Sequence, residues 1–271
     1  MSNQPELVDA LLTIDNRVAT LTFNRDDVRN ELTGTKLVDD IERTVAWINA
    51  DESIAALIIT GAGKAFSSGG NVKHMLARQG SFGGDVYEVQ KHYREGIQRI
   101  PLALYQLDVP SIAAINGPAI GAGFDLACMC DIRIAADGAT MAESFVSVGI
   151  IPGDGGAWFL QRLVGYQRAA ELTFSGRVLT AGEAKDLGIV LDVVPAVMLL
   201  ERAEQLAASF AAKPPQALRL TKRLMKSAQR MELRDFLDHC AVFQGMCHNT
   251  EDHLEAVASM LEKRTPRFTG R

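Results

Sequence analysis

The chain has 271 residues, 47% of them apolar, and a formal net charge of −5. That apolar content supports a sizeable folded core and argues against disorder, and the negative charge argues against a general nucleic-acid surface. The first residues carry no signal-peptide pattern and no uncharged run approaches a membrane span, so we expect a soluble cytoplasmic protein without a membrane partner.

The first sixty residues alternate strand and helix patterns. Residues 7–14 and 17–23 are strand-like runs on either side of Asp15-Asn16, which predicts a β-hairpin. Residues 34–50 place apolar side chains three and four positions apart, which predicts an amphipathic helix. Residues 55–60 form an apolar run of the length of a buried strand. This order is typical of a mixed α/β protein.

The middle of the chain contains a glycine turn at residues 66–71, a helical stretch over residues 72–78 and a flexible loop over residues 79–84. A long helix is predicted from residue 85 to about residue 106, and Pro101 is expected to kink or split it. Residues 111–131 then read as a buried strand, a turn and an apolar helix.

Later residues continue the alternation up to about residue 195 and then become wholly helical. Thr180 and Glu183 have the spacing of a capping box at the start of a helix. The remaining predicted strands cover residues 132–135, 140–142 and 189–194, and the remaining helices cover residues 156–163, 165–174, 180–187, 197–212, 215–229, 233–247 and 251–263. We therefore expect a core over residues 1–200 and a helical region over residues 201–271.

Three glycine-rich turns precede predicted helices, at residues 66–71, 121–123 and 149–156. The first backbone N–H groups of a helix have no partner within the helix, so such a corner can bind an anion or an oxyanion. It can equally be a tight turn without chemistry. Cys128 and Cys130 lie in an apolar run without a His or Cys partner nearby, so we interpret them as buried thiols rather than metal ligands.

The order of these motifs carries a resemblance to a known family. The motifs are Asn24-Arg25-x3-Arg29-Asn30, Ala65-Phe66-Ser67-Ser68-Gly69-Gly70-Asn71-Val72-Lys73, Ala113-Ala114-Ile115-Asn116-Gly117-x-Ala119-x-Gly121-Ala122-Gly123, Cys130-Asp131, Gly149-x-x-Pro152-Gly153-x-Gly155-Gly156 and Ser175-Gly176-x5-Gly182-x-Ala184-x3-Gly188. From about residue 7 to the C-terminus, the chain resembles the crotonase superfamily, the enoyl-CoA hydratase/isomerase family.

The resemblance implies an α/β fold made of a spiral of β-β-α turns, followed by a C-terminal helical region for trimerisation. It also implies a homotrimer or a homohexamer built as a dimer of trimers. Coenzyme A enters such enzymes as part of the acyl-CoA substrate, so no separate cofactor and no metal are expected.

The resemblance also implies two backbone donors and a CoA-binding segment. The N–H groups of Gly70 and Ala122 match the two halves of an oxyanion hole that stabilises a thioester enolate. The expected CoA-binding positions are Arg29, Ser68, Gly70, Asn71, Val72, Lys73, Ala122 and Lys263. Arg29 and Lys263 match positions of cations near the CoA phosphates, although each can also be a solvated surface charge.

At the acid/base positions the sequence departs from the hydratases, which carry two glutamates. The first position is Asp125, which is one methylene shorter, and the second is Phe145, which cannot transfer a proton. Glu143 shares a face with Phe145 if the strand is extended. Asp154 lies one residue beyond the catalytic aspartate of some isomerases and dehalogenases of this family.

We rank Asp125 first, with Glu143 and Asp154 as further catalytic candidates. Each of the three also has a structural interpretation, namely a helix-start residue, a salt-bridged residue and a helix cap.

The implied function is hydration or double-bond shift of an enoyl-CoA. Family frequency favours hydration, whereas a single matching carboxylate favours isomerisation, because one base can move one proton. A non-catalytic acyl-CoA-binding relative is the alternative that Phe145 supports, and a scaffold role of the helical tail is a third.

Overall fold

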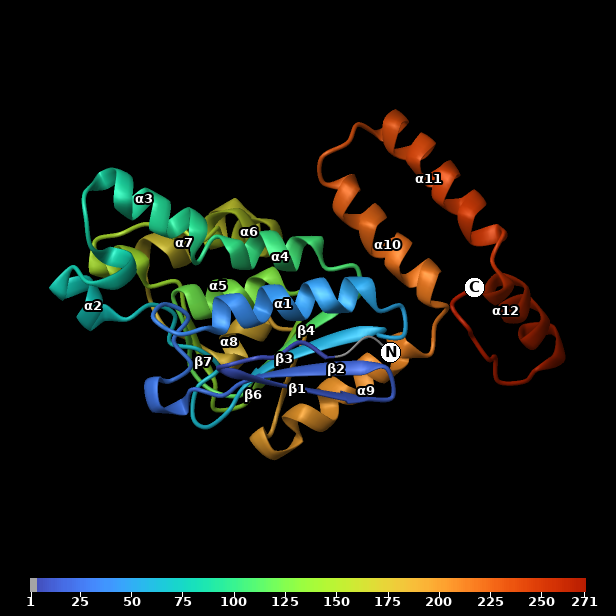
Figure 1. Ribbon diagram of the computed structural model, residues 1–271, viewed down its shortest axis with the longest axis horizontal. Helices are drawn as coiled ribbons and strands as arrows, with labels where there is room; N and C mark the ends of the chain where they lie inside the picture. The colour runs from blue at the N-terminus through green and yellow to red at the C-terminus, as the bar shows by residue number, and fades with distance from the viewer. Residues whose placement is uncertain (1–3) are drawn as a thin grey trace.

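The computed structural model describes residues 4–271, whose strands form one six-stranded and one three-stranded sheet (Figure 1). The larger sheet has the order β1-β2-β3-β4-β6-β9, in which only the β1/β2 pair is antiparallel. Its strands are β1 (Ala10–Asp15), β2 (Val18–Phe23), β3 (Ala56–Gly61), β4 (Ser111–Ile115), β6 (Ile132–Ala136) and β9 (Asp192–Val194). Because parallel neighbours need crossover connections, from β2 onward the chain leaves this sheet after each strand and returns to it for the next one, as in the predicted spiral.

The smaller sheet has the order β5-β7-β8, with strands β5 (Ala119–Ile120), β7 (Thr140–Ala142) and β8 (Leu179–Thr180). The sequence analysis did not predict β5 and β8, because two residues are too few to show an alternating pattern. The predicted hairpin is confirmed. Its first strand starts at Ala10 instead of residue 7, because the backbone N–H groups of Val8 and Asp9 donate to the Asp40 carboxylate.

The helices that connect these strands along the chain cover the hydrophobic core. They are α1 (Leu37–Ala50), α2 (Val72–Ala77), α3 (Val86–Glu95), α4 (Arg99–Gln106), α5 (Ala122–Met129), α6 (Gly156–Val164), α7 (Tyr166–Ser175) and α8 (Ala181–Asp186). The apolar face predicted for α1 is buried, with Leu37, Ile41 and Ile48 fully enclosed. The capping box of Thr180 and Glu183 is also confirmed. Helix α5 is buried along its whole length, which explains why its sequence shows no polar face.

Pro101 does not kink the helix predicted over residues 85–106. The chain breaks at Gly96, and α4 begins at Arg99, so Pro101 is the third residue of the new helix. The N–H groups of the first helical turn have no acceptor within the helix, so a proline there costs no hydrogen bond. The expected split is present, but glycine causes it.

The last helices are α9 (Leu199–Ala211), α10 (Pro215–Ala228), α11 (Leu233–His248) and α12 (Glu251–Glu262). Helix α9 packs against β2, β3, β4 and β6, whereas α10, α11 and α12 extend away from the core as an arm (Figure 1). We propose that the domain division predicted at residue 200 lies after α9, since this helix covers the sheet.

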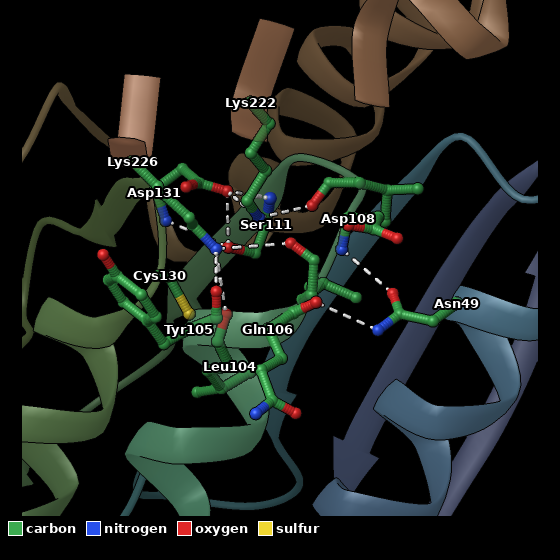
Figure 2. Close-up of polar contacts among 12 residues, drawn as sticks. Asn49, Leu104, Tyr105, Gln106, Asp108, Ser111, Cys130, Asp131, Lys222 and Lys226 are labelled. Atoms are coloured by element: carbon green, nitrogen blue, oxygen red, sulfur yellow. Dashed lines mark hydrogen bonds and ion pairs between the residues drawn. The ribbon is translucent and has the colours of Figure 1, made fainter. Parts of the chain in front are cut away.

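Basic side chains of α10 fasten the arm to the core (Figure 2). Lys222 Nζ donates to the carbonyl of Val109 at 2.5 Å and to Oδ2 of Asp131 at 2.6 Å. Lys226 donates to the carbonyls of Leu104, Tyr105 and Leu107 at the end of α4. These carbonyls form the negative end of the α4 dipole, so a cation is favourable there.

Candidate active site

Two of the predicted glycine turns lie side by side. Ser67 forms a parallel bridge with Ala119, and the Ile120 N–H donates to the Ser67 carbonyl at 3.0 Å. Three residues further along each segment stand Gly70 and Ala122. The parallel register therefore brings the two predicted donors to equivalent positions.

Both donors are available. Among the described residues, the N–H groups of Gly70 and Ala122 have no acceptor, and Ala122 is the first residue of α5, where the helix offers none. Gly70 and Ala122 line the same pocket, which is open to solvent. Two backbone N–H groups at the wall of one pocket can together bind one carbonyl oxygen, which is the role that the resemblance implied for them.

The walls of this pocket are mainly apolar. Its lining also includes Thr33, Met75, Ser81, Phe82, His92, Tyr93, Ile97, Phe145, Ile150 and Asp154. Several of them belong to residues 79–93, which cover the predicted flexible loop and the first part of the helix after it. An apolar wall with few polar groups suits an acyl chain beside a reacting thioester.

Asp154 is the carboxyl that lines this pocket. It is 3% exposed and lies in the third glycine turn, which Gln98 fixes by donating to the Gly153 carbonyl at 2.7 Å. Burial raises the pKa of Asp154 above its ordinary value of 3.8, and the Asp125 carboxyl and nearby N–H groups partly offset this. Asp154 is not a helix cap, because Gly155 precedes α6 and no side chain caps that helix.

Asp125 lies behind Asp154. It is fully buried on α5 and is not part of the pocket lining. Burial, together with the neighbouring Asp154 and Glu143 carboxyls, raises the pKa of Asp125 well above 3.8. Its oxygens accept no hydrogen bond of normal geometry from the described backbone, so it is not the helix-start residue considered above. The geometry therefore favours Asp154 over Asp125 as the group that meets a substrate.

Glu143 does not share a strand face with Phe145. Strand β7 ends at Ala142, and Phe145 begins a 3-10 helix (Phe145–Val148), so the alternation of an extended chain does not apply. Phe145 lines the pocket, whereas Glu143 is buried and accepts a hydrogen bond from Thr173 of α7. Burial raises the pKa of Glu143 to about 6. Glu143 is also not the salt-bridged residue considered above, because its partner is a hydroxyl.

The expected CoA segment surrounds the first glycine turn. Ser68 donates its N–H to the carbonyl of Arg29 at 3.0 Å, which joins the two segments. Asn71 caps α2 by accepting from the N–H groups of Lys73 and His74. The side chains of Arg29, Val72 and Lys73 are exposed beside the turn. These residues form one surface next to Gly70.

Lys263 does not join them. It ends α12, and α12 and α2 lie at opposite ends of the molecule (Figure 1). Within one chain, the expected role of Lys263 near the CoA phosphates is therefore not met. The resemblance aligned a sequence position, but the extended arm carries that position away from the pocket.

Tyr93 is a site residue that the sequence analysis did not single out. It lines the pocket beside Asp154, and a Cβ atom at Gly153 would lie 3.0 Å from its ring. Burial and the nearby Asp154 carboxyl raise the pKa of its hydroxyl. In the sequence it stands within the helix predicted over residues 85–106 and belongs to none of the motifs considered there.

Within residues 4–271, no three His, Cys, Asp or Glu side chains gather as metal ligands would. In the same residues, no helix is long and apolar enough to cross a membrane.

Comparison with known proteins agrees with this geometry. A family model described as enoyl-CoA hydratase/isomerase matches residues 13–271. A probable enoyl-CoA hydratase of Mycobacterium bovis is 33% identical over 96% of this chain and 98% of its own. A 1,2-epoxyphenylacetyl-CoA isomerase of Escherichia coli is also 33% identical, over 95% of this chain and 97% of its own.

Comparison of the fold with solved structures finds proteins of the same kind. The crystal structure of an enoyl-CoA hydratase from Bacillus anthracis superposes with a TM-score of 0.90 and 33% identity, and it covers 97% of this chain and 100% of that chain. The predicted fold class is confirmed by this similarity.

Proposed function

Because this chain belongs to the enoyl-CoA hydratase/isomerase family and is an enzyme of that type acting on acyl-CoA thioesters, we propose that its own reaction is a double-bond shift in an enoyl-CoA. The observation that carries the proposal is the composition of the pocket. Among the described residues, Asp154 is the one carboxyl that lines it together with Gly70 and Ala122, and Phe145, which by the resemblance matches the second hydratase acid, lines it as well.

In the proposed reaction, the thioester oxygen accepts hydrogen bonds from Gly70 and Ala122. The Asp154 carboxylate removes a proton from C2 of a 3-enoyl-CoA, and the negative charge moves to the oxygen held by the two N–H groups. The same carboxyl returns the proton to C4, and the double bond moves to C2–C3. One such donor contributes about 3 kcal/mol to catalysis in other enzymes.

The chemistry of Asp154 supports this role. A base is most effective when its pKa lies near the working pH, and burial raises the pKa of Asp154 in that direction. Hydration would require a second group that holds and activates water. Phe145 cannot do so, which is why isomerisation is the simpler reaction for this pocket.

We also propose a homotrimer or a homohexamer. Helix α12 exposes Leu254, Val257 and Leu261, which lie at helical spacing along one stripe. Exposed apolar stripes of this kind mark protein interfaces. An arm that carries them away from the core is suited to contact with another copy of the chain.

The test of the reaction is the variant Asp154→Asn, which keeps the shape of the side chain but not its basicity. We expect kcat for isomerisation of a 3-enoyl-CoA to fall by about 10²–10⁴-fold. Binding of a saturated acyl-CoA, measured by calorimetry, should change little, because the two N–H donors remain.

Asp137→Asn is the matched control, since Asp137 is exposed and lies outside the pocket. Crotonyl-CoA hydration is measured in parallel. Hydration much faster than isomerisation, or full activity of Asp154→Asn, would contradict the proposal.

A further inference from the structure

Asp125 and Asp154 form a buried pair of carboxyl groups with no other strong partner. Their side chains come from α5 and from the third glycine turn, and the residues are 0% and 3% exposed. None of their four oxygens accepts a hydrogen bond of normal geometry from the other described residues. Two buried carboxylates side by side repel each other and lack donors, so the pair retains a proton.

The surroundings decide which of the two holds that proton. Asp154 faces the open pocket, where the N–H groups of Asp154 itself and Gly156 favour its charged form. Asp125 is fully enclosed and has the Glu143 carboxyl as a further acidic neighbour. Charge is therefore less costly on Asp154, and the proton belongs to Asp125.

Gly156 fixes where Asp125 lies. A Cβ atom added to Gly156 would lie 1.9 Å from Oδ2 of Asp125, which is far inside contact distance. The carboxyl group therefore packs directly against the first residue of α6, two positions after Asp154 in the chain, and the two carboxyl groups act on each other's pKa. Because glycine has no side chain, it is the only residue at position 156 that leaves room for the Asp125 carboxyl group.

We propose that Asp125 is a positioning residue, which stays protonated and donates a hydrogen bond through its carboxyl O–H to Asp154, so that Asp154 alone meets the acyl group as a base. The inference rests on the proposed function, because it assigns the base to Asp154. It replaces the direct catalytic role that the sequence suggested for Asp125. The hydrogen bond both orients the Asp154 carboxylate and moderates the effect of burial on its basicity.

The other titratable groups around the pair do not supply an alternative donor cation. Glu143 follows β7 and is acidic, Cys128 stands one turn along α5, and Tyr93 of α3 faces Asp154. The buried Arg133 guanidinium donates instead to the carbonyls of Ile189 and Cys130. His92 of α3 lines the same pocket, and its buried Nδ1 makes no hydrogen bond to either aspartate.

The test compares Asp125→Asn with Asp125→Leu in the full chain. The asparagine amide still donates to Asp154, so kcat/KM for the 3-enoyl-CoA should stay within about tenfold and the acid limb of its pH profile should not move. Leucine has a similar size and no donor. Because the hydrogen bond to Asp154 is lost in this variant, the pKa of Asp154 should rise, and the acid limb of the pH profile should move up by about one pH unit. A shift of one unit is a tenfold change in the ionisation constant of Asp154.

A second measurement does not depend on activity or on the folding of the leucine variant. In the infrared spectrum at neutral pH, we expect a carboxylic acid C=O band from Asp125. It should disappear in Asp125→Asn and persist in Asp154→Asn. Thermal unfolding of each variant identifies any that does not fold.

The outcomes separate the two proposals. If Asp125→Asn loses 10²-fold or more while Asp154→Asn stays active, Asp125 is itself the base and both proposals fail. If Asp154→Asn is inactive but the infrared band is absent from the wild type, or a folded Asp125→Leu keeps the wild-type acid limb, only the positioning role of Asp125 fails.

Discussion

Three buried carboxyl groups lie close together near the pocket, and each has a different environment. Asp154 reaches the pocket, Asp125 is enclosed behind it, and Glu143 is tied to Thr173 of α7. Burial raises the pKa of all three, because an apolar surrounding disfavours the charged form. All three are carboxylic acids, so residue type does not distinguish them. Exposure to the pocket distinguishes Asp154, the proposed base, from Asp125 and Glu143.

Glu143 gives a stability prediction. Its pKa is about 6 in the folded chain, above the ordinary 4.5, so the folded state binds its proton more tightly. The favourable contribution is complete below about pH 4.5 and is lost as the pH rises to about 6. Glu143→Gln keeps an acceptor for Thr173 without the charge. Relative to the wild type, we expect it to gain about 1 kcal/mol of unfolding free energy between these pH values. Urea unfolding at pH 4.5 and pH 7 measures this, and a difference that does not depend on pH would contradict it.

Close backbone approach at glycines brings together the two elements that carry the proposed oxyanion donors. Gly69 has a φ of 73°, and a Cβ atom there would lie 2.6 Å from the Ile120 carbonyl oxygen and 2.9 Å from the Ala122 nitrogen. A Cβ atom at Gly123 would lie 2.2 Å from the Ser67 carbonyl oxygen. The turn after β3 and the start of α5 can therefore meet only because these positions lack side chains.

Gly69→Ala tests this contact. The new methyl group would push the first turn away from Ala122 and would strain the backbone at a positive φ. We expect kcat/KM to fall by about 10²-fold or more, since one oxyanion donor is displaced, and the unfolding free energy to fall by about 2 kcal/mol. Gly138→Ala is the control, because a Cβ atom there meets nothing within 4 Å. Activity of Gly69→Ala within tenfold of the wild type would show that the turns need no such approach.

The whole molecule consists of a spiral core and an arm held by charged contacts. Arg219 of α10 donates to the carbonyls of Ile48 in the last turn of α1 and of Asp51 and Ile54 in the segment after it, and Lys222 pairs with Asp131 (Figure 2). Burial alone would raise the pKa of Asp131, but Lys222 and the hydrogen bonds from Ser111 lower it. These contacts fix the direction of α10, while the apolar side chains of α12 stay exposed.

The exposed stripe of α12 predicts self-association. Light scattering after size-exclusion chromatography should give a mass three or six times the 29.4 kDa of the chain. Replacing Leu254 and Leu261 together by glutamate should reduce that mass, because burying a charge without a partner is unfavourable. Val197→Glu, at an exposed apolar residue outside the arm, should leave the mass unchanged. A monomeric wild-type chain would exclude the proposed assembly.

The sequence by itself determined the alternation of strands and helices and, through the order of its glycine motifs, the family. The alternation depends on local backbone needs: glycine at a tight turn, apolar spacing along a helix, and a capping box such as that of Thr180 and Glu183. Such needs restrict the residue at one position and therefore leave a visible pattern. The two oxyanion positions were implied by the resemblance to that family. The oxyanion role of Gly70 and Ala122 stays a prediction, and the structure adds that both residues line one pocket.

Only the tertiary structure decided which carboxyl faces the pocket, where the helix after residue 85 breaks, and how far Lys263 lies from the CoA segment. Side-chain direction depends on packing between elements distant in sequence, as Asp125 against Gly156 shows. A residue's type states what chemistry it can perform. Its neighbours across the fold decide whether it meets the substrate or, as we propose for Asp125, acts through another residue.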